Sequence, residues 1–209
     1  MVLCAGFNRE ACASAESLLF SGQDGVKESM HAFSIAPISG DEADHLLVRS
    51  DEYMAALYPP ESNHLVSSES LRSGDALFLG AFITEEHQVG EVSDDCGEQE
   101  IPTRCIGCVA ARFYRDQGYA EIKRLFVDEG FRGNAIARTL MAAIESGILA
   151  EDIFCARLEM GIYQPEADAL YRSLGYREIP PFGDYLLDPL SQFLEKVLGD
   201  RDGGVDPGT

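Results

Sequence analysis

The sequence predicts an α/β (α+β) fold in which helices flank a central, mixed and mostly antiparallel sheet. Three observations support this prediction. The apparent strands and helices follow the order β-α-α-β-β-β-α-β-α-β-β, which is not a regular βαβ repeat. The turn sequence Asp116-Gln117-Gly118 separates two apolar segments, as in a hairpin. The 209 residues are 45% hydrophobic and 25% charged, which suits a soluble globular protein with one large domain.

The chain divides into predicted helices and strands at its turn and helix-breaking residues. The predicted elements of the whole chain are a strand at 31–39, a helix at 40–58, a helical turn at 67–73, strands at 76–83, 105–114 and 119–127, a helix at 134–150, a strand at 154–162, a helix at 165–174, and strands at 176–179 and 192–198. Asp41 is placed to cap the first helix, and Pro59-Pro60 ends it. The run ALFLGAFI at 76–83 is apolar throughout, as in a buried strand.

The second half shows clearer periodicity. An apolar stripe with a spacing of four residues runs along the helix at 134–150, through Ile136, Leu140, Ile144 and Ile148. Pro165 stands in the first turn of the last helix, and Gly175 stands at its end. These signals define two amphipathic helices on either side of a predicted strand.

The domain is expected to span residues 31–198, with less regular segments at both ends. Residues 1–30 have little periodicity and are interpreted as a mobile extension, and 199–209 as a disordered tail. An acidic insertion occupies 84–104, where residues 84–103 contain seven acidic residues and no lysine or arginine. Its like charges repel one another, so we interpret it as a solvated loop.

Charge and cysteine usage exclude several classes of function. The net charge of −20 argues against nucleic acid as a partner, because binding to phosphates needs a basic patch. No apolar run approaches the roughly 20 residues that cross a membrane, and the N-terminus lacks the basic start of a signal peptide, so we expect a cytoplasmic protein.

The six cysteines follow neither a disulfide framework nor a zinc-binding spacing, so no metal is expected. Cys105 and Cys108 are three apart on a strand and are expected on opposite faces.

The loop from Gly130 to Ala135 (GFRGNA) is the most informative segment. It follows a strand that ends near Val127 and enters the helix at 134–150. Glycine allows tight turns and close approach of a ligand to the backbone. The N–H groups of a first helical turn have no intrahelical partner, and the helix dipole adds positive charge there. The loop alone is compatible with a plain strand–helix turn or with a site for a phosphate-bearing cofactor.

Its context resembles the GNAT N-acetyltransferase superfamily. In that family the motif Gln/Arg-x-x-Gly-x-Gly/Ala wraps the pyrophosphate of acetyl-CoA. Here the fourth and sixth positions, Gly133 and Ala135, fit the motif, while Gly130 replaces the Gln or Arg and Ala137 replaces a glycine common in bacterial members. The phrases at 57–64 (LYPPESNH), 167–176 (ADALYRSLGY) and 179–185 (IPPFGDY) also match small bacterial-type members.

The resemblance implies a fold of six to seven strands with about four helices, and a binding site for acetyl-CoA as co-substrate. The residues that it assigns to this site are Leu125, Phe126 and Val127 along the pantetheine arm, Arg132, Gly133, Asn134, Ala135, Ile136 and Ala137 around the pyrophosphate, and Gln164 in a polar contact.

The implied reaction is attack by an amine on the thioester. An alkyl amine has a pKa of about 10.4, so its deprotonation at neutral pH costs roughly 4 to 5 kcal/mol and a general base helps. The resemblance assigns Tyr171 as the acid that protonates the leaving sulfur and Glu121 as the base. His64 is a rival base, and ordered water is another. Tyr171 is also compatible with an aromatic anchor, and Glu121 with a pair to Lys123.

The predicted function is therefore transfer of an acetyl group from acetyl-CoA to a primary amine by direct attack in a ternary complex. Tyr58, His64 and Tyr185 are the candidate residues for binding the acceptor, which is either a small molecule or a peptide. Two alternatives stay open: a non-catalytic module that binds acyl-CoA, and a protein lysine acetyltransferase whose acidic insertion docks a basic tail. No nucleic acid or membrane partner is expected, and a homodimer is possible.

Overall fold

The computed structural model describes residues 32–62, 66–72, 75–84 and 103–199. Its elements are β1 Phe33–Pro37, α1 Asp44–Leu57, α2 Ser68–Leu71, β2 Ala76–Thr84, β3 Thr103–Tyr114, β4 Tyr119–Val127, α3 Ile136–Ala150, β5 Cys155–Gly161, α4 Pro165–Ser173, β6 Arg177–Ile179 and β7 Ser191–Val197, with 3₁₀ turns at Pro60–Ser62, Arg115–Gln117 and Glu129–Phe131. Residues 1–30 lie outside the described residues, as do 85–102 of the acidic insertion and 200–209 of the predicted tail.

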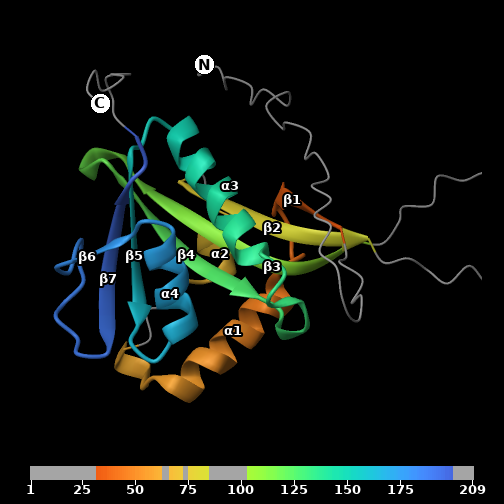
Figure 1. The fold of residues 1–209 in the computed structure, drawn as a ribbon, viewed down its shortest axis with the longest axis horizontal. Helices are drawn as coiled ribbons and strands as arrows, with labels where there is room; N and C mark the ends of the chain where they lie inside the picture. The colour runs from red at the N-terminus through yellow and green to blue at the C-terminus, as the bar shows by residue number, and fades with distance from the viewer. Residues whose placement is uncertain (1–31, 63–65, 73–74, 85–102, 200–209) are drawn as a thin grey trace, which may run out of the picture.

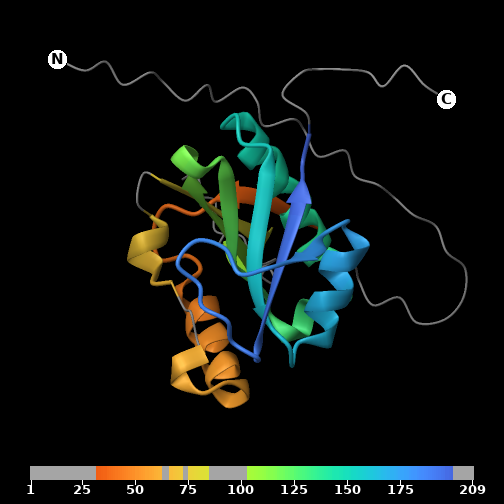
Figure 2. The same cartoon turned by 90° about the vertical axis from the view of Figure 1, so that its left-hand side faces the viewer.

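The strands form one seven-stranded sheet in the order β1-β2-β3-β4-β5-β7-β6. Neighbouring strands are antiparallel except for β4 and β5, which are parallel and are joined through α3. Helices α3 and α4 cover one face of the sheet, and α1 and α2 lie against the other (Figures 1 and 2). The mixed, mostly antiparallel sheet predicted from the sequence is confirmed.

The core has a part on each face. The apolar stripe of α3 packs on β2, β3 and β4, and all four predicted stripe residues are buried there. On the other face, Leu46 and Leu47 of α1 and Leu71 of α2 pack on β3 and β4. Burial of such side chains contributes about 1.5 to 3 kcal/mol each, so both layers hold the central strands in place.

Two local predictions are wrong. Asp41 does not cap α1, because a turn spans 41–44 and the helix begins at Asp44 with buried Ala43 as its N-cap. Cys105 and Cys108 lie on the same face of the sheet, in the core beneath α1. The cause is a β-bulge, since the β2–β3 register shifts by one residue between Cys105 and Gly107 and interrupts the side-chain alternation.

Two kinds of feature are relevant to function in the part of the chain that the structure describes: clusters of metal ligands and helices that could cross a membrane. Within those residues, no three His, Cys, Asp or Glu side chains gather closely enough to hold a metal ion. None of the described helices has the length and apolar character needed to cross a membrane.

Candidate active site

The site begins where β4 and β5 separate. These parallel strands pair only over Ala120–Ile122 and Ala156–Leu158, although β4 continues to Val127 and β5 to Gly161. A cleft of about 730 Å³ opens at this point, between α3 and α4 on one side and α1 on the other. Its lining residues are 122–127 of β4, Glu159 and Met160 of β5, Phe131 to Gly133 and Ala135 to Arg138, Gln164, Glu166, Ala167, Leu170 and Tyr171 around α4, and Ser50, Tyr53, Met54 and Val66.

A bulge in β4 marks the same point. Arg124 has a φ of 57°, and the β3–β4 register shifts there by one residue. The Arg124 guanidinium donates to the Val66 carbonyl oxygen through Nε at 2.9 Å and through Nη2 at 2.7 Å, and it also pairs with Asp51 of α1. The bulge therefore fixes the edge of the cleft to α1 and to the segment that follows it.

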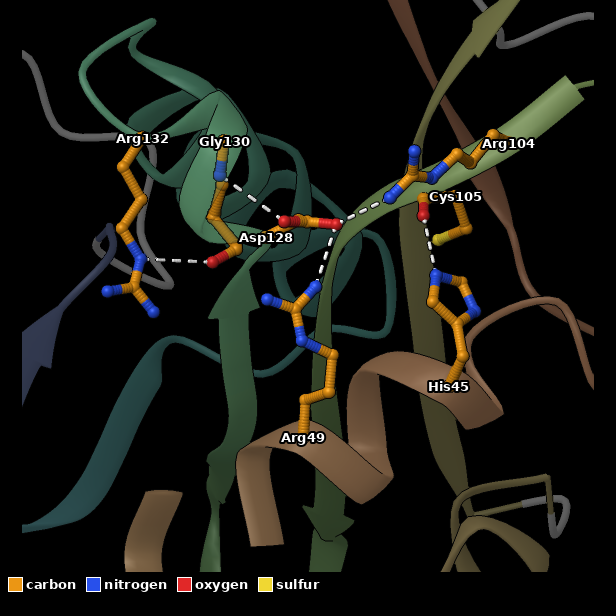
Figure 3. Close-up of polar contacts among 8 residues, drawn as sticks. His45, Arg49, Arg104, Cys105, Asp128, Gly130 and Arg132 are labelled. Carbon is orange, nitrogen blue, oxygen red and sulfur yellow. Dashed lines mark hydrogen bonds and ion pairs between the residues drawn. The ribbon is translucent and has the colours of Figure 1, made fainter. Parts of the chain in front are cut away.

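The loop after β4 is held by Asp128. This carboxylate is only 5% exposed and forms ion pairs with Arg49 at 2.9 Å and Arg104 at 2.7 Å (Figure 3). Its Oδ1 accepts a hydrogen bond from the Gly130 N–H at 3.3 Å. Burial alone would raise the pKa of Asp128, but the hydrogen bonds from Arg49 and Gly130 and the charges of both arginines lower it. The carboxylate thus stays ionised and ties the loop to α1 and β3.

Arg132 lies along the end of β4. Its Nε donates to the Val127 carbonyl oxygen at 3.1 Å (Figure 3). Its guanidinium lies over the Phe126 ring, 5.6 Å from the centroid. Arg132 also lines the cleft, so its charge faces the space beside the loop. Asn134 does not line the cleft, because its amide donates to the Phe131 carbonyl oxygen within the loop.

The N-terminus of α3 completes the anion-binding features. Gly133 and Ala135 adopt positive φ values of 84° and 58°. Ala135 is the N-cap and supplies no capping oxygen, and the first turn contains no acidic residue. The first-turn N–H groups and the positive end of the helix dipole are therefore available to an anion at the cleft, whose wall includes residues 135–138.

Tyr171 lines the same cleft from the neighbouring helix α4. Its ring is 7% exposed and packs edge-on against Tyr176 with 5.7 Å between centroids. Burial, and to a smaller extent the charge of Glu159, raises the pKa of Tyr171, so the phenol stays protonated. Its hydroxyl makes no hydrogen bond to any residue in the described ranges. A buried hydroxyl without a partner is costly, and this donor is suited to a ligand atom.

Glu159 is a cleft carboxylate that the sequence analysis missed. Its Oε1 accepts a hydrogen bond from Ser191 Oγ at 2.7 Å, and its charge acts on Tyr171, Tyr58 and Tyr185. The local sequence carried no signal for this position, because Arg157 stands two residues earlier in the same strand and Glu159 is only partly buried.

Glu121 lies in a second hollow of about 720 Å³. It is 3% exposed, and three donors surround it: Lys123 Nζ at 2.8 Å, the Tyr185 hydroxyl at 2.6 Å and the Tyr114 hydroxyl at 3.2 Å. The expected pair with Lys123 is therefore present. Lys123 and Val66 line both hollows, so the two spaces adjoin.

The remaining predicted residues divide between the two hollows and the fold. Gln164 lines the cleft, and Tyr185 lines the second hollow. Tyr58 lines neither hollow; its hydroxyl accepts a hydrogen bond from the Tyr163 N–H at 2.8 Å, and its ring packs on the backbone of Gly161. His64 lies outside the described residues.

Comparisons with known proteins agree with this architecture. A protein-family model described as "Acetyltransferase (GNAT) domain" matches residues 92–178. An IAA acetyltransferase of Azospirillum brasilense is 37% identical over 158 residues, which cover 76% of this chain and 92% of the relative. The uncharacterized N-acetyltransferase YsnE of Bacillus subtilis is 27% identical over 173 residues, 81% of this chain and 100% of that protein.

Solved structures share the fold. A protein of Klebsiella pneumoniae, provisionally named an acyl-CoA N-acyltransferase, superposes with a TM-score of 0.59 at 27% identity and covers 80% of this chain and 98% of its own. The PaiA N-acetyltransferase of Thermoplasma acidophilum, solved with coenzyme A, has a TM-score of 0.56 at 19% identity, over 79% and 99% of the two chains. The fold and its relatives thus define an acyltransferase enzyme. The chain belongs to the GNAT acetyltransferase family.

Proposed function

We propose that this enzyme transfers the acetyl group of acetyl-CoA to a primary amine by direct attack within a ternary complex. The observation that carries the proposal is the cleft between β4 and β5, which joins the uncapped N-terminus of α3 to the buried hydroxyl of Tyr171. The names of the relatives, which include N-acetyltransferases, and the coenzyme A in one neighbouring structure support the donor and the reaction type.

The donor site would use the groups that face the cleft. The first-turn N–H groups of α3 and the Arg132 guanidinium suit the pyrophosphate, since charge-assisted hydrogen bonds are about twice as strong as neutral ones. Beyond the bulge, Leu125, Phe126 and Val127 of β4 no longer pair with β5, which leaves a strand edge for the amide groups of the pantetheine arm. Gln164 lines the same channel.

The chemistry requires one bond to form and one to break. The amine nitrogen forms a bond to the carbonyl carbon, the carbon–sulfur bond breaks, and the nitrogen gives up a proton to a base. Tyr171 would donate its proton, or a hydrogen bond, to the departing sulfur. No cysteine in the described part of the chain is suited to a covalent step, because burial raises the pKa of Cys105 and Cys155 to about 11 and also raises that of Cys108.

Two carboxylates are candidates for the base. Glu121 has its lone pairs engaged by Lys123, Tyr185 and Tyr114. Glu159 lines the cleft itself and has one oxygen held by Ser191. A base must reach the proton that it removes, and this favours Glu159, with Glu121 holding Lys123 and Tyr185 in position.

The proposal is tested by calorimetric binding of acetyl-CoA, followed by assay of thiol release with a panel of amines and a basic peptide. Wild type should bind acetyl-CoA, and Arg132→Ala should bind it more weakly. Glu159→Gln should lower kcat more than Glu121→Gln does if Glu159 is the base. Wild type that neither binds acetyl-CoA nor releases thiol would refute the proposal, and activity on the peptide alone would favour a protein acetyltransferase.

A further inference from the structure

The second hollow lies beside the cleft, on the face of the sheet that α1 covers. Its floor comes from β3 and β4, and its outer wall is the segment between β6 and β7, residues 182–189. Lys123 and Val66 belong to both linings, so the hollow adjoins the cleft beside the point where β4 and β5 separate. The hollow is therefore a candidate site for the acceptor.

One cation in this hollow, Arg112, has no carboxylate partner among the described residues. Arg112 of β3 is partly buried and lies opposite Glu121 of β4 in the strand register. The other arginines of β3, β4 and β5 each have a carboxylate partner, namely Arg104 with Asp128, Arg124 with Asp51, and Arg157 with Glu195. The Arg112 guanidinium lies over the Tyr114 ring, 5.8 Å from its centroid.

Glu121 does not take the role of partner to Arg112. Its Oε1 accepts from Lys123 and Tyr185, and its Oε2 accepts from Tyr114. Lys123 thus neutralises Glu121, and the charge of Arg112 is left facing the hollow. An arginine fork matches the two oxygens of a carboxylate.

The rest of the lining selects for the body of the acceptor. Tyr114 and Tyr119 stack with 4.8 Å between centroids, and Phe182 packs edge-on against Tyr119 at 5.5 Å and against Tyr185 at 5.3 Å. These rings form an apolar wall that suits an alkyl or aryl group. Asp184 is exposed at the rim, and its charge is felt at Tyr119. That negative charge disfavours an acceptor with a second carboxylate.

We infer that the acceptor is an amino acid-like amine, whose carboxylate binds Arg112 in the second hollow while its amine points toward the cleft. This inference rests on the proposed N-acetyl transfer. Arg112 is then a specificity-determining residue rather than part of the reaction itself. Arg112 lies opposite Glu121, which stands two residues before Lys123 on β4. The backbone of Arg112 is therefore roughly 7 Å along the strands from the junction of the two hollows. The test for this reason includes an amino acid with a long chain between its amine and its carboxylate.

The experiment compares matched amines with and without a carboxylate. The pairs are ε-aminocaproate with n-hexylamine and phenylalanine with phenethylamine, assayed for kcat/KM in wild type, Arg112→Gln and Arg112→Lys. Arg115→Gln is the matched control, since Arg115 lies outside both hollows and pairs with Glu151. Acetyl-CoA affinity and the free energy of unfolding are measured for each variant, so that loss of the donor site or of the fold is recognised.

We expect wild type to prefer the carboxylated member of at least one pair. Arg112→Gln should lower kcat/KM for that member by roughly 10- to 100-fold, the effect of one lost charge-assisted interaction, and should leave its uncarboxylated partner unchanged. Arg112→Lys should restore part of the preference, and Arg115→Gln should match wild type.

Three results would overturn the inference while the proposed function stands. The first is acetylation of amines with no preference for a carboxylate in wild type. The second is a preference that Arg112→Gln retains, and the third is an equal loss of kcat/KM for both members of a pair in that variant. Wild type that acetylates no amine would instead overturn the proposed function, and this inference with it.

Discussion

The variant Tyr171→Phe isolates the role of one hydroxyl group. The Tyr171 ring is buried against Tyr176, and its hydroxyl makes no hydrogen bond within the described residues. Phenylalanine keeps the ring and its packing. Because no protein hydrogen bond is lost, the free energy of unfolding should stay the same or rise slightly.

The expected loss of activity follows from the charge on the leaving sulfur. A hydrogen bond to a charged group contributes about 1.5 to 3 kcal/mol, and each 1.36 kcal/mol corresponds to about tenfold in rate. The variant should therefore show a kcat roughly 10- to 100-fold lower, with KM for acetyl-CoA little changed, because the interaction strengthens only as the carbon–sulfur bond breaks. Since burial raises the pKa of Tyr171, its ionisation should not limit the rate below about pH 10.

Tyr176→Phe is the matched control. The Tyr176 hydroxyl donates to Glu145 Oε1 at 3.0 Å, and Tyr176 does not line the cleft. This variant should lose about 1 to 3 kcal/mol of stability and keep its kcat. Initial rates of thiol release and urea unfolding give both quantities. An unchanged kcat in Tyr171→Phe, or equal losses of kcat in the two variants, would refute the assignment of Tyr171 as the acid.

Three further predictions concern the loop, its anchor and a buried thiol. Gly133→Ala should lower the free energy of unfolding in urea by about 1 kcal/mol or more, because φ is 84°; the added Cβ meets no atom, so this cost comes from the backbone alone. Ala135→Gly should leave the free energy of unfolding unchanged or raise it by up to about 1 kcal/mol, because φ is already positive there. Equal effects of the two substitutions would contradict this argument. Asp128→Asn should weaken acetyl-CoA binding and lower the free energy of unfolding. Because folding lowers the pKa of Asp128 from 3.8, its ionised carboxylate stabilises the wild type only above that pH. The calorimetric Tm values of variant and wild type should therefore converge as the pH falls through the pKa of Asp128 in the folded protein. Burial raises the pKa of Cys105 from 9.0 to about 11, so the neutral thiol stabilises the fold below pH 9 and this contribution is lost as the pH rises toward 11. The free energy of unfolding should fall by up to about 1.4 kcal/mol per pH unit in that range. Cys105→Ala should remove this pH dependence.

Much of the fold is encoded in local patterns. The apolar stripe of α3 and the Pro165 start of α4 predicted both helices to within two residues. Failures occurred where packing overrode local signals. The β2–β3 bulge placed Cys105 and Cys108 on one face, which strict alternation cannot predict.

The candidate site shows the same division. Arg132, Gly133 and Ala135 belong to one short loop, so a contiguous motif was sufficient to propose them, and their catalytic and binding roles stay predictions. Glu159 and Arg112 stand on separate strands with no local motif around them. Their relevance follows from the hollows that they line, which depend on strand order and register.

The sequence by itself determined the class of fold, the strand–loop–helix unit and the resemblance to an acetyltransferase family, because these depend on residues that are neighbours along the chain. Only the tertiary structure decided where β4 and β5 part, that Tyr58 supports the fold rather than lining a hollow, and that Arg112 faces one without a carboxylate partner in the described residues. The physical reason is that each of these features depends on contacts between segments tens of residues apart, and such contacts are set by packing on both faces of the sheet.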